Sequence, residues 1–120
     1  MIEVLKSKIH RATVTGADLH YEGSITISKE LLDAANICIY QRVSIANINN
    51  GNRFDTYVIK TDDTGVICLN GAAARMVSVG DLIIIMAYQL INEDDAYVHS
   101  PTIIQLGNNN EILTSNYDTN

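Results

Sequence analysis

The fold class is decided by residues 43–59, VSIANINNGNRFDTYVI. Residues 43–48 and 53–59 are rich in β-branched and aromatic side chains, which favour strands. They flank Asn49-Asn50-Gly51-Asn52, and an Asn-Gly pair tolerates the positive φ angles of a type I′ turn. The stretch therefore predicts a β-hairpin.

Further short strands are expected on both sides of this hairpin. Residues 2–15 carry β-branched side chains in a loose alternation, which predicts a strand that bends near Ser7 or Lys8. Turn residues separate the remaining apolar runs, and we expect strands at residues 25–27, 66–69, 82–91 and 102–106. Many short strands at close spacing favour a small β-barrel over a sheet of βαβ units.

One or two short helices are expected beside these strands. Ser28 is a good N-cap for a helix that runs through Ala35, and Asn36 is an acceptable C-terminal stop. Residues 72–76 can form one helical turn. Residues 107–120 are rich in Asn and Thr and have little to bury, so we expect a flexible C-terminal tail there.

Composition narrows the classes of partner. The net charge is −6, so the chain lacks the basic surface that nucleic acid requires. Only 18% of the residues are charged, against about 25% in typical domains, which favours an oligomer that hides part of its surface. No apolar run approaches the length of a membrane span and residues 1–8 do not resemble a signal peptide, so we expect a cytoplasmic protein.

The two cysteines have neither the spacing nor the histidine neighbours of a metal site. Cys38 and Cys68 lie thirty residues apart, and we interpret both as small buried hydrophobic residues with reduced thiols. We expect no metal.

Two stretches stand out as chemically informative. The first runs from Lys8-Ile9-His10-Arg11 to His20-Tyr21-Glu22-Gly23-Ser24. The second contains residues 50–57, NGNRFDTY, and is followed by Asn70-Gly71-Ala72-Ala73-Ala74. In this order and spacing, the motifs resemble bacterial pyruvoyl-dependent aspartate 1-decarboxylases over residues 1–106. The resemblance implies a six-stranded double-psi β-barrel domain at 1–106, assembled as a homotetramer with active sites between neighbours.

The residues themselves make that chemistry reasonable. Decarboxylation of an α-amino acid leaves a carbanion that needs an electron sink, for which pyridoxal phosphate is the usual cofactor. A chain of 120 residues with four lysines and no Gly-rich phosphate loop is a poor host for it. A pyruvoyl ketone, which forms a Schiff base with the substrate amine, does the same work. Ser24 can supply that ketone if its hydroxyl attacks the Gly23 carbonyl and the chain breaks into residues 1–23 and 24–120.

The resemblance assigns roles to individual residues. Ser24 becomes the pyruvoyl group, Tyr57 returns a proton to the substrate, and Thr56 donates to the Gly23 oxygen during cleavage. Substrate carboxylates are expected to meet Lys8, Arg53, Thr56, Gly71, Ala72 and Ala73, with secondary places for Asn70, Tyr21, His10 and Arg11. Taken alone, each residue also has an ordinary structural interpretation, such as a solvated strand charge for Arg53 or packing for His10.

The implied reaction converts L-aspartate into β-alanine and CO2 for pantothenate and coenzyme A synthesis, after autocatalytic cleavage of a proenzyme. A helper protein for maturation is a further possible partner. Ala46 and Asn47 stand where the family often has a bulky aromatic residue, so the resemblance does not define the shape of that pocket wall. Two alternatives remain: a non-enzymatic β-barrel binding module in which Gly23-Ser24 is a plain turn, and a decarboxylase for a related acid such as glutamate.

Overall fold

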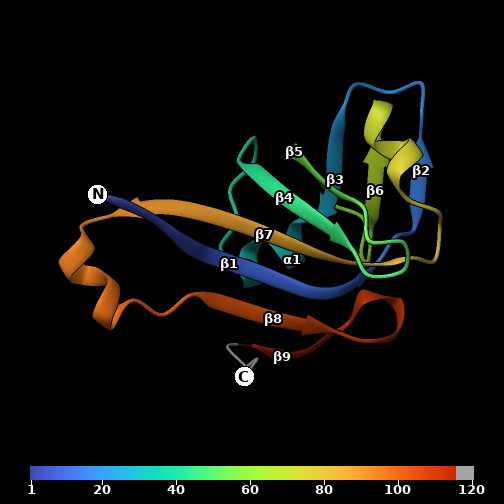
Figure 1. Ribbon diagram of the computed structural model, residues 1–120. Helices are drawn as coiled ribbons and strands as arrows, with labels where there is room; N and C mark the ends of the chain where they lie inside the picture. Colours follow the sequence, from blue (N-terminus) through green and yellow to red (C-terminus); the bar gives the residue numbers. More distant parts are fainter. Residues whose placement is uncertain (116–120) are drawn as a thin grey trace.

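The computed structural model describes residues 1–115 and confirms the expected mainly β fold (Figure 1). Its strands are β1 (Ile2–Thr13), β2 (Gly16–Asp18), β3 (Ser24–Ser28), β4 (Arg42–Asn47), β5 (Arg53–Thr61), β6 (Ile67–Asn70), β7 (Leu82–Ile91), β8 (Thr102–Leu106) and β9 (Ile112–Ser115). Its helices are α1 (Lys29–Ala35) and the 3-10 turns η1 (Gly71–Met76), η2 (Glu93–Val98) and η3 (Asn108–Asn110).

The strands close into a barrel because β2, at one end of the sheet, directly continues β1, which lies near the other end. The strand order is β2-β6-β3-β5-β4-β7-β1-β8-β9, and only Val14 and Thr15 separate β1 from β2. Val14 donates its N–H to the Asp81 carbonyl (2.9 Å), and Thr15 donates to the Ile67 carbonyl (2.8 Å). β1 and β2 therefore act as two halves of one bent strand.

Counted this way, the barrel has six strands, as expected, and these strands lie within residues 1–91 of the expected domain at 1–106. The pairs β3·β5 and β2·β6 are parallel, whereas β3·β6, β4·β5, β4·β7 and β1·β7 are antiparallel. This mixture is consistent with the double-psi β-barrel that the resemblance implies. β8 adds to β1 in parallel outside the barrel, and β9 pairs with β8.

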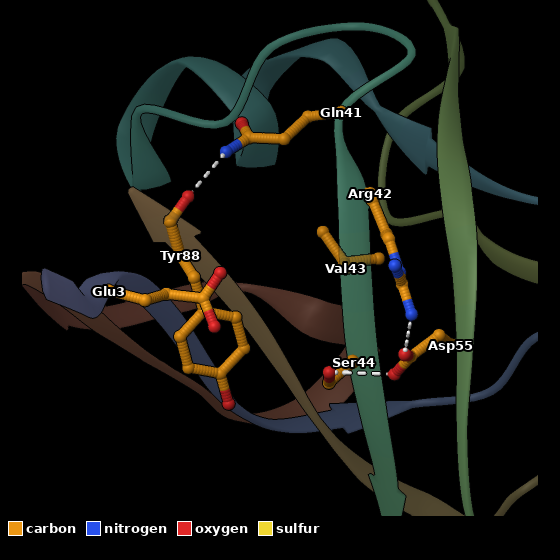
Figure 2. A pocket seen from close by; sticks show the side chains of 7 residues that line it. All are labelled: Glu3, Gln41, Arg42, Val43, Ser44, Asp55 and Tyr88. Carbon is orange, nitrogen blue, oxygen red and sulfur yellow. Dashed lines mark hydrogen bonds and ion pairs between the residues drawn. The ribbon is translucent and has the colours of Figure 1, made fainter. Parts of the chain in front are cut away.

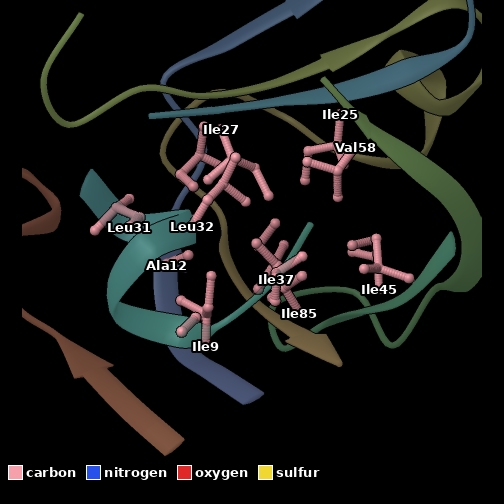
Figure 3. Close-up of a cluster of buried hydrophobic side chains, with 14 of the residues drawn as sticks. Ile9, Ala12, Ile25, Ile27, Leu31, Leu32, Ile37, Ile45, Val58 and Ile85 are labelled. Carbon is pink, nitrogen blue, oxygen red and sulfur yellow. The ribbon is translucent and has the colours of Figure 1, made fainter. Parts of the chain in front are cut away.

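The barrel interior is filled by branched aliphatic side chains. Strand alternation directs every second residue inward, so Ile25 and Ile27 of β3 meet Val58 of β5 (Figure 3). Leu31 and Leu32 of α1 are also buried in this cluster, so the helix covers part of it. The largest fully buried side chains are Ile9, Ile25, Ile27, Leu31, Ile45, Ile67, Leu69, Ile83, Ile85, Ile104, Val14 and Val43.

The hairpin at residues 43–59 is present, but its turn differs from the expected type. Asn47 donates to the Asn52 carbonyl (2.8 Å), and Gly51 donates to the Asn47 carbonyl (2.9 Å). Of the turn residues, Gly51 alone has a positive φ, at 77°. A type I′ turn requires two positive φ angles. The Asn47 side chain holds the longer loop, because Oδ1 accepts from the Asn49 N–H (2.9 Å) while Nδ2 donates to Asp81 and Met76.

Helix α1 has the predicted length, and its C-terminal stop is confirmed. Asn36 adopts the left-handed conformation (φ 58°, ψ 44°) and donates its N–H to Asp33. Ser28, however, does not cap the helix with its side chain. Its hydroxyl instead donates to the Asp63 carbonyl (2.7 Å) and accepts from the Val66 N–H (2.6 Å). The serine therefore joins the helix start to the turn before β6.

The expectation of a flexible tail from residue 107 is wrong for residues 107–115, which form η3 and β9. Asn110 is buried, and its side chain bonds both backbone groups of Thr13 and the carbonyl of Gly65. Residues 116–120 of the expected tail lie outside the described residues. Within residues 1–115, every helix is too short or too polar to traverse a bilayer.

Candidate functional site

The Gly23–Ser24 bond lies where the chain enters β3. The Ser24 side chain is 1% exposed, and its hydroxyl donates to the Glu22 carbonyl (3.0 Å). The same oxygen accepts a hydrogen bond from Asn70 Nδ2 (2.9 Å). A buried hydroxyl with a donor on one side and an acceptor on the other has a fixed position. Ser24 is therefore held in place without contacting solvent.

Gly71 approaches the same bond from the other side. Its φ is +67°, and a Cβ there would lie 2.7 Å from Gly23 Cα, 2.8 Å from Gly23 N and 3.1 Å from the Tyr21 carbonyl oxygen. All three are backbone atoms, which cannot move aside without shifting the main chain. A Cβ on Gly23 itself would meet nothing within 4 Å. The crowding that requires glycine is thus at position 71, while the space beside Gly23 is open.

Thr56 and Tyr57 precede the point where β5 begins to pair with β3. The parallel ladder starts at Ile25 and Val58, and its register, continued two residues back, would set Ser24 beside Tyr57 and Gly23 beside Thr56. Thr56 is half-buried and Tyr57 is 37% exposed, because neighbouring strand residues face opposite sides. Thr56 and Tyr57 therefore lie on opposite faces of β5.

The two expected substrate cations lie elsewhere in the chain. Lys8 pairs with Met86, Met86 with Ser44, and Ser44 with Asp55. Paired residues share a face, so Lys8 lies on the outer face of the barrel, three strands or roughly 14 Å from β5. Arg53 is exposed at the start of β5, four residues from Tyr57 or roughly 13 Å along the strand. A single chain does not bring them to Ser24.

The remaining candidates divide between these two regions. Ala72 and Ala73 follow Gly71 in η1, and Gly71 is the residue that contacts Gly23. Tyr21 contacts this region through its backbone, and its side chain is exposed.

His10 and Arg11 lie on β1. Arg11 has a φ of 62° at a β-bulge between Ile9 and Ala12. The pKa of His10 is lowered, first by burial and then by the charges of Lys8 and Arg11.

An outer-face cleft of about 630 Å³ was not anticipated from the sequence (Figure 2). Asp55 accepts hydrogen bonds there from Ser44 (2.7 Å) and Arg42 (2.6 Å), which lower the pKa of its carboxyl. Arg53 lines a smaller hollow of about 260 Å³ beside Ser44 and Asp55. The first cleft is lined by Glu3, Gln41, Arg42, Val43, Ser44, Asp55 and Tyr88. It contains none of the expected site residues and lies on the face that carries Lys8.

Two polar neighbours of Ser24 were also missed. Thr26 Oγ1 accepts from Asn70 Nδ2 (2.9 Å), and Cys68 Sγ donates to Asn70 Oδ1 (3.4 Å). The interpretation of both cysteines as buried is wrong, because Cys38 is exposed and Cys68 is partly exposed. Their spacing could have predicted this arrangement. Ser24 and Thr26 are two residues apart, as are Cys68 and Asn70, and residues two apart share a strand face.

Fold and site together define a small β-barrel protein that holds a buried serine against a sterically crowded backbone bond. Among residues 1–115, no group of three or more His, Cys, Asp or Glu side chains is arranged to hold a metal ion.

Comparison with known proteins then gives the family. The family model for aspartate decarboxylase matches residues 1–113. An aspartate 1-decarboxylase of Caldicellulosiruptor saccharolyticus is 58% identical over 94% of this chain and 89% of its own. Those of Clostridium botulinum (strain Loch Maree) and Cytophaga hutchinsonii are each 56% identical, covering 98% and 93% of this chain and 94% and 98% of theirs. The chain belongs to the aspartate decarboxylase family. The expected class, a carboxy-lyase that decarboxylates aspartate, is thereby confirmed.

Proposed function

We propose that this chain cleaves itself between Gly23 and Ser24, converts Ser24 into a pyruvoyl group, and uses it to turn L-aspartate into β-alanine and CO2. The observation that carries the proposal is the fixed, buried Ser24 hydroxyl between Glu22 and Asn70, with Gly71 packed against Gly23.

The cleavage begins with an attack by Ser24 Oγ on the Gly23 carbonyl carbon. The Gly23–Ser24 amide becomes an ester, and the former amide nitrogen becomes a free amine. Negative charge develops on the Gly23 oxygen, where a hydrogen bond from Thr56 would stabilise it. The parallel register of β3 and β5 supports this role, because its continuation two residues before Ile25 and Val58 would set Gly23 beside Thr56.

Elimination then breaks the chain. The Ser24 Cα loses its proton, the Cβ–Oγ bond breaks, and the Gly23 carboxylate leaves with residues 1–23. Asn70 Nδ2 already donates to this oxygen and would stabilise the charge that it acquires. The dehydroalanine at position 24 takes up water and releases ammonia, which leaves the pyruvoyl group on residues 24–120. The site fits a pyruvoyl group made in this way, because the group forms from the atoms of Ser24, which is already buried there.

The pyruvoyl group supplies an electron sink for the pair of electrons left when CO2 departs. The chain's own residues bind and orient the substrate. Arg53 can hold a carboxylate through two parallel N–H bonds, and Lys8 supplies a second positive charge. The backbone N–H groups of Gly71, Ala72 and Ala73 can bind the other carboxylate, because their small side chains allow a close approach. Tyr57 returns the proton to the substrate carbon.

We further propose that the active enzyme is a homotetramer with sites between neighbouring chains. Lys8 and Arg53 lie on the outer face of the barrel, away from Ser24 of the same chain. A neighbour that packs on this face would complete the site. Large exposed apolar side chains support such packing, among them Leu90, Tyr97 and Val98.

The product β-alanine would enter pantothenate and coenzyme A synthesis in the cytoplasm. Two free cysteines, one of them exposed, are compatible with that reducing compartment. Maturation by this chain alone is the simplest arrangement. A helper protein enters only if the purified precursor fails to cleave.

Intact-mass analysis and CO2 release test the proposal together. The purified chain, incubated warm, should yield two fragments of 23 and 97 residues and release CO2 from L-aspartate. Ser24→Ala should stay intact and inactive, and L-glutamate should be a much poorer substrate than L-aspartate. An unbroken wild-type chain that releases no CO2, also after incubation in cell extract, would support the binding-module alternative. A preference for glutamate would overturn the substrate assignment.

A further inference from the structure

The geometry points to Cys68 as a positioning residue for the cleavage step, acting through the side-chain amide of Asn70. The inference rests on the proposed self-cleavage at Gly23–Ser24. Cys68 itself contacts neither the scissile bond nor the substrate, and the role assigned to its thiol is to orient Asn70.

Four side chains form a compact block on one face of the β3–β6 pair. Ser24 pairs with Asn70 and Thr26 pairs with Cys68 in an antiparallel ladder, so all four point the same way. The hydrophobic core occupies the opposite face, where Ile25 pairs with Leu69. The block is therefore a polar unit on the side of the sheet turned away from the core.

The hydrogen bonds within this block define the orientation of the Asn70 amide. Nδ2 donates to Ser24 Oγ and to Thr26 Oγ1, at 2.9 Å each. Oδ1 accepts from Cys68 Sγ at 3.4 Å. Asn70 is 3% exposed, so water has little access to replace any of these partners. The thiol is the protein group that bonds the oxygen end of the amide.

The orientation matters because the two ends of an amide have opposite hydrogen-bonding character. With Nδ2 toward Ser24, the serine hydroxyl accepts from Asn70 and directs its own proton to the Glu22 carbonyl. A reversed amide would present an acceptor, and the hydroxyl would turn its proton toward Asn70. Ser24 would then lose the donor that stabilises charge on Oγ as the Cβ–Oγ bond breaks.

The thiol packs against β2 and keeps its proton, as this role requires. Gly16 pairs with Cys68 on β2, and Sγ approaches it so closely that a Cβ there would lie 3.0 Å from the sulfur. Burial, followed by the charge of Asp18, raises the pKa of the Cys68 thiol. The group therefore keeps its proton at neutral pH and stays a donor to Asn70.

The test compares cleavage rates of precursors expressed cold and then warmed, with intact mass as the readout. Cys68→Ala removes the donor and should slow cleavage about five-fold, the effect of one lost hydrogen bond. Cys68→Ser keeps a donor and should cleave within about two-fold of wild type. Cys38→Ala removes an exposed thiol and should cleave at the wild-type rate. Chains that have already cleaved should decarboxylate aspartate with unchanged kcat/KM in every variant.

Rescue by serine distinguishes hydrogen bonding from packing, because alanine and serine differ by a single hydroxyl. If Cys68→Ala proves unstable, Cys68→Val fills the space without a donor and should show the same slow cleavage. Equal rates for Cys68→Ala and wild type would overturn the inference, as would equally slow cleavage of the alanine and serine variants. If wild type itself fails to cleave, the proposed function fails first and the inference falls with it.

Discussion

At the scale of single residues, the cleavage segment depends on one unusually close backbone contact. Gly71 sits in the left-handed region with its α-carbon packed against Gly23, while the neighbouring Ser24 is fixed by hydrogen bonds. Close packing on one side and hydrogen bonds on the other restrict how the bond can move before it reacts. Pre-organisation of this kind lowers the entropy cost of reaching the reactive geometry.

Gly71→Ala should therefore impair both stability and cleavage. The added Cβ would lie 2.7 Å from Gly23 Cα, in addition to the conformational penalty of about 1–2 kcal/mol for a left-handed alanine. Gly51→Ala is the matched control, because Gly51 has a similar φ of +77° with nothing within 4 Å of its Cβ position. Urea denaturation and cleavage rate should show a larger loss for Gly71→Ala. Equal effects in the two variants would contradict the contact.

The sequence indicated the identities of these residues better than their surroundings. Ser24, Asn70 and Gly71 could be selected because their motifs are distinctive, and the structure brings them together. Cys68 was misread because a lone cysteine usually packs as a small hydrophobic residue. Its hydrogen bond to Asn70 depends on which face of β6 turns away from the core, and four residues of strand are too short to reveal that.

At the scale of elements, polar side chains connect segments that are distant in the sequence. Asn47 of β4 donates to Asp81, just before β7 (2.9 Å), and Asp81 also accepts from the Ser78 N–H (2.9 Å). These bonds connect the hairpin to the turn that precedes β7. They also explain why the hairpin turn departs from the type that Asn-Gly favours, since tertiary contacts fix its flanking residue.

The Asp81 contact predicts a pH dependence of stability. The hydrogen bonds from Asn47 and then Ser78 lower the pKa of Asp81 below its ordinary 3.8. A carboxyl with a lower pKa in the folded state stabilises the fold above its unfolded pKa, and the contribution disappears as the pH falls through the folded value. Asp81→Asn should therefore be less stable than wild type at pH 7, with the difference shrinking below about pH 4. Urea midpoints across this range measure it.

Asp94→Asn, in the exposed η2 turn, serves as the control for loss of one negative charge. Between neutral and acidic pH, the stability of Asp94→Asn should change by the same amount as that of wild type. A constant gap between Asp81→Asn and wild type at all pH values would mean that the carboxylate makes no net contribution to folding.

The C-terminal segment was the main error of sequence analysis, and its cause is physical. Asn108-Asn109-Asn110 has the composition of a tail, yet Asn110 bonds to Thr13, which lies 97 residues away in the sequence. A contact over that separation leaves no local periodicity. By contrast, the strands and α1 were readable because their apolar spacing repeats within a few residues.

Asn110→Ala should destabilise the protein by about 2–3 kcal/mol, because it removes three partly buried hydrogen bonds and leaves their backbone partners unsatisfied. Asn108→Ala, at an exposed position of the same turn, should change stability by less than about 0.5 kcal/mol. Denaturant unfolding measures both. A chain shortened to residue 106 should be at least as unstable as Asn110→Ala. Wild-type stability in the shortened chain would restore the view of residues 107–115 as a dispensable tail.

At the scale of the whole molecule, the expected site residues fall into two separate groups. Ser24, Asn70 and Gly71 surround the scissile bond, while Lys8 and Arg53 lie on the outer face beside Ser44 and its ion-paired neighbours. The sequence could not reveal this separation, because it follows from barrel closure and strand register. The same separation explains why the larger outer-face cleft contains none of the residues around Ser24.

Subunit complementation follows from this arrangement. Ser24→Ala cannot form the pyruvoyl group, whereas Lys8→Ala keeps it and loses one substrate cation, so each variant alone should be nearly inactive. If one chain supplies Ser24 and its neighbour supplies Lys8, random mixing by co-expression creates some sites with both native residues. Two differently tagged chains, purified through both tags, should then recover about a quarter of wild-type activity per site.

The comparison is decisive because sites contained within one chain would give no recovery. Lys8 lies on the outer face, roughly three strand spacings from β5, so the register of one chain does not bring it to Ser24. Each variant carried on both tags and purified in the same way controls for residual activity. Mixed oligomers as inactive as these controls would show that Lys8 and Ser24 of one chain share a site. The outer face would then lose its place in the active centre, although the carboxy-lyase assignment, which rests on the family, would stand.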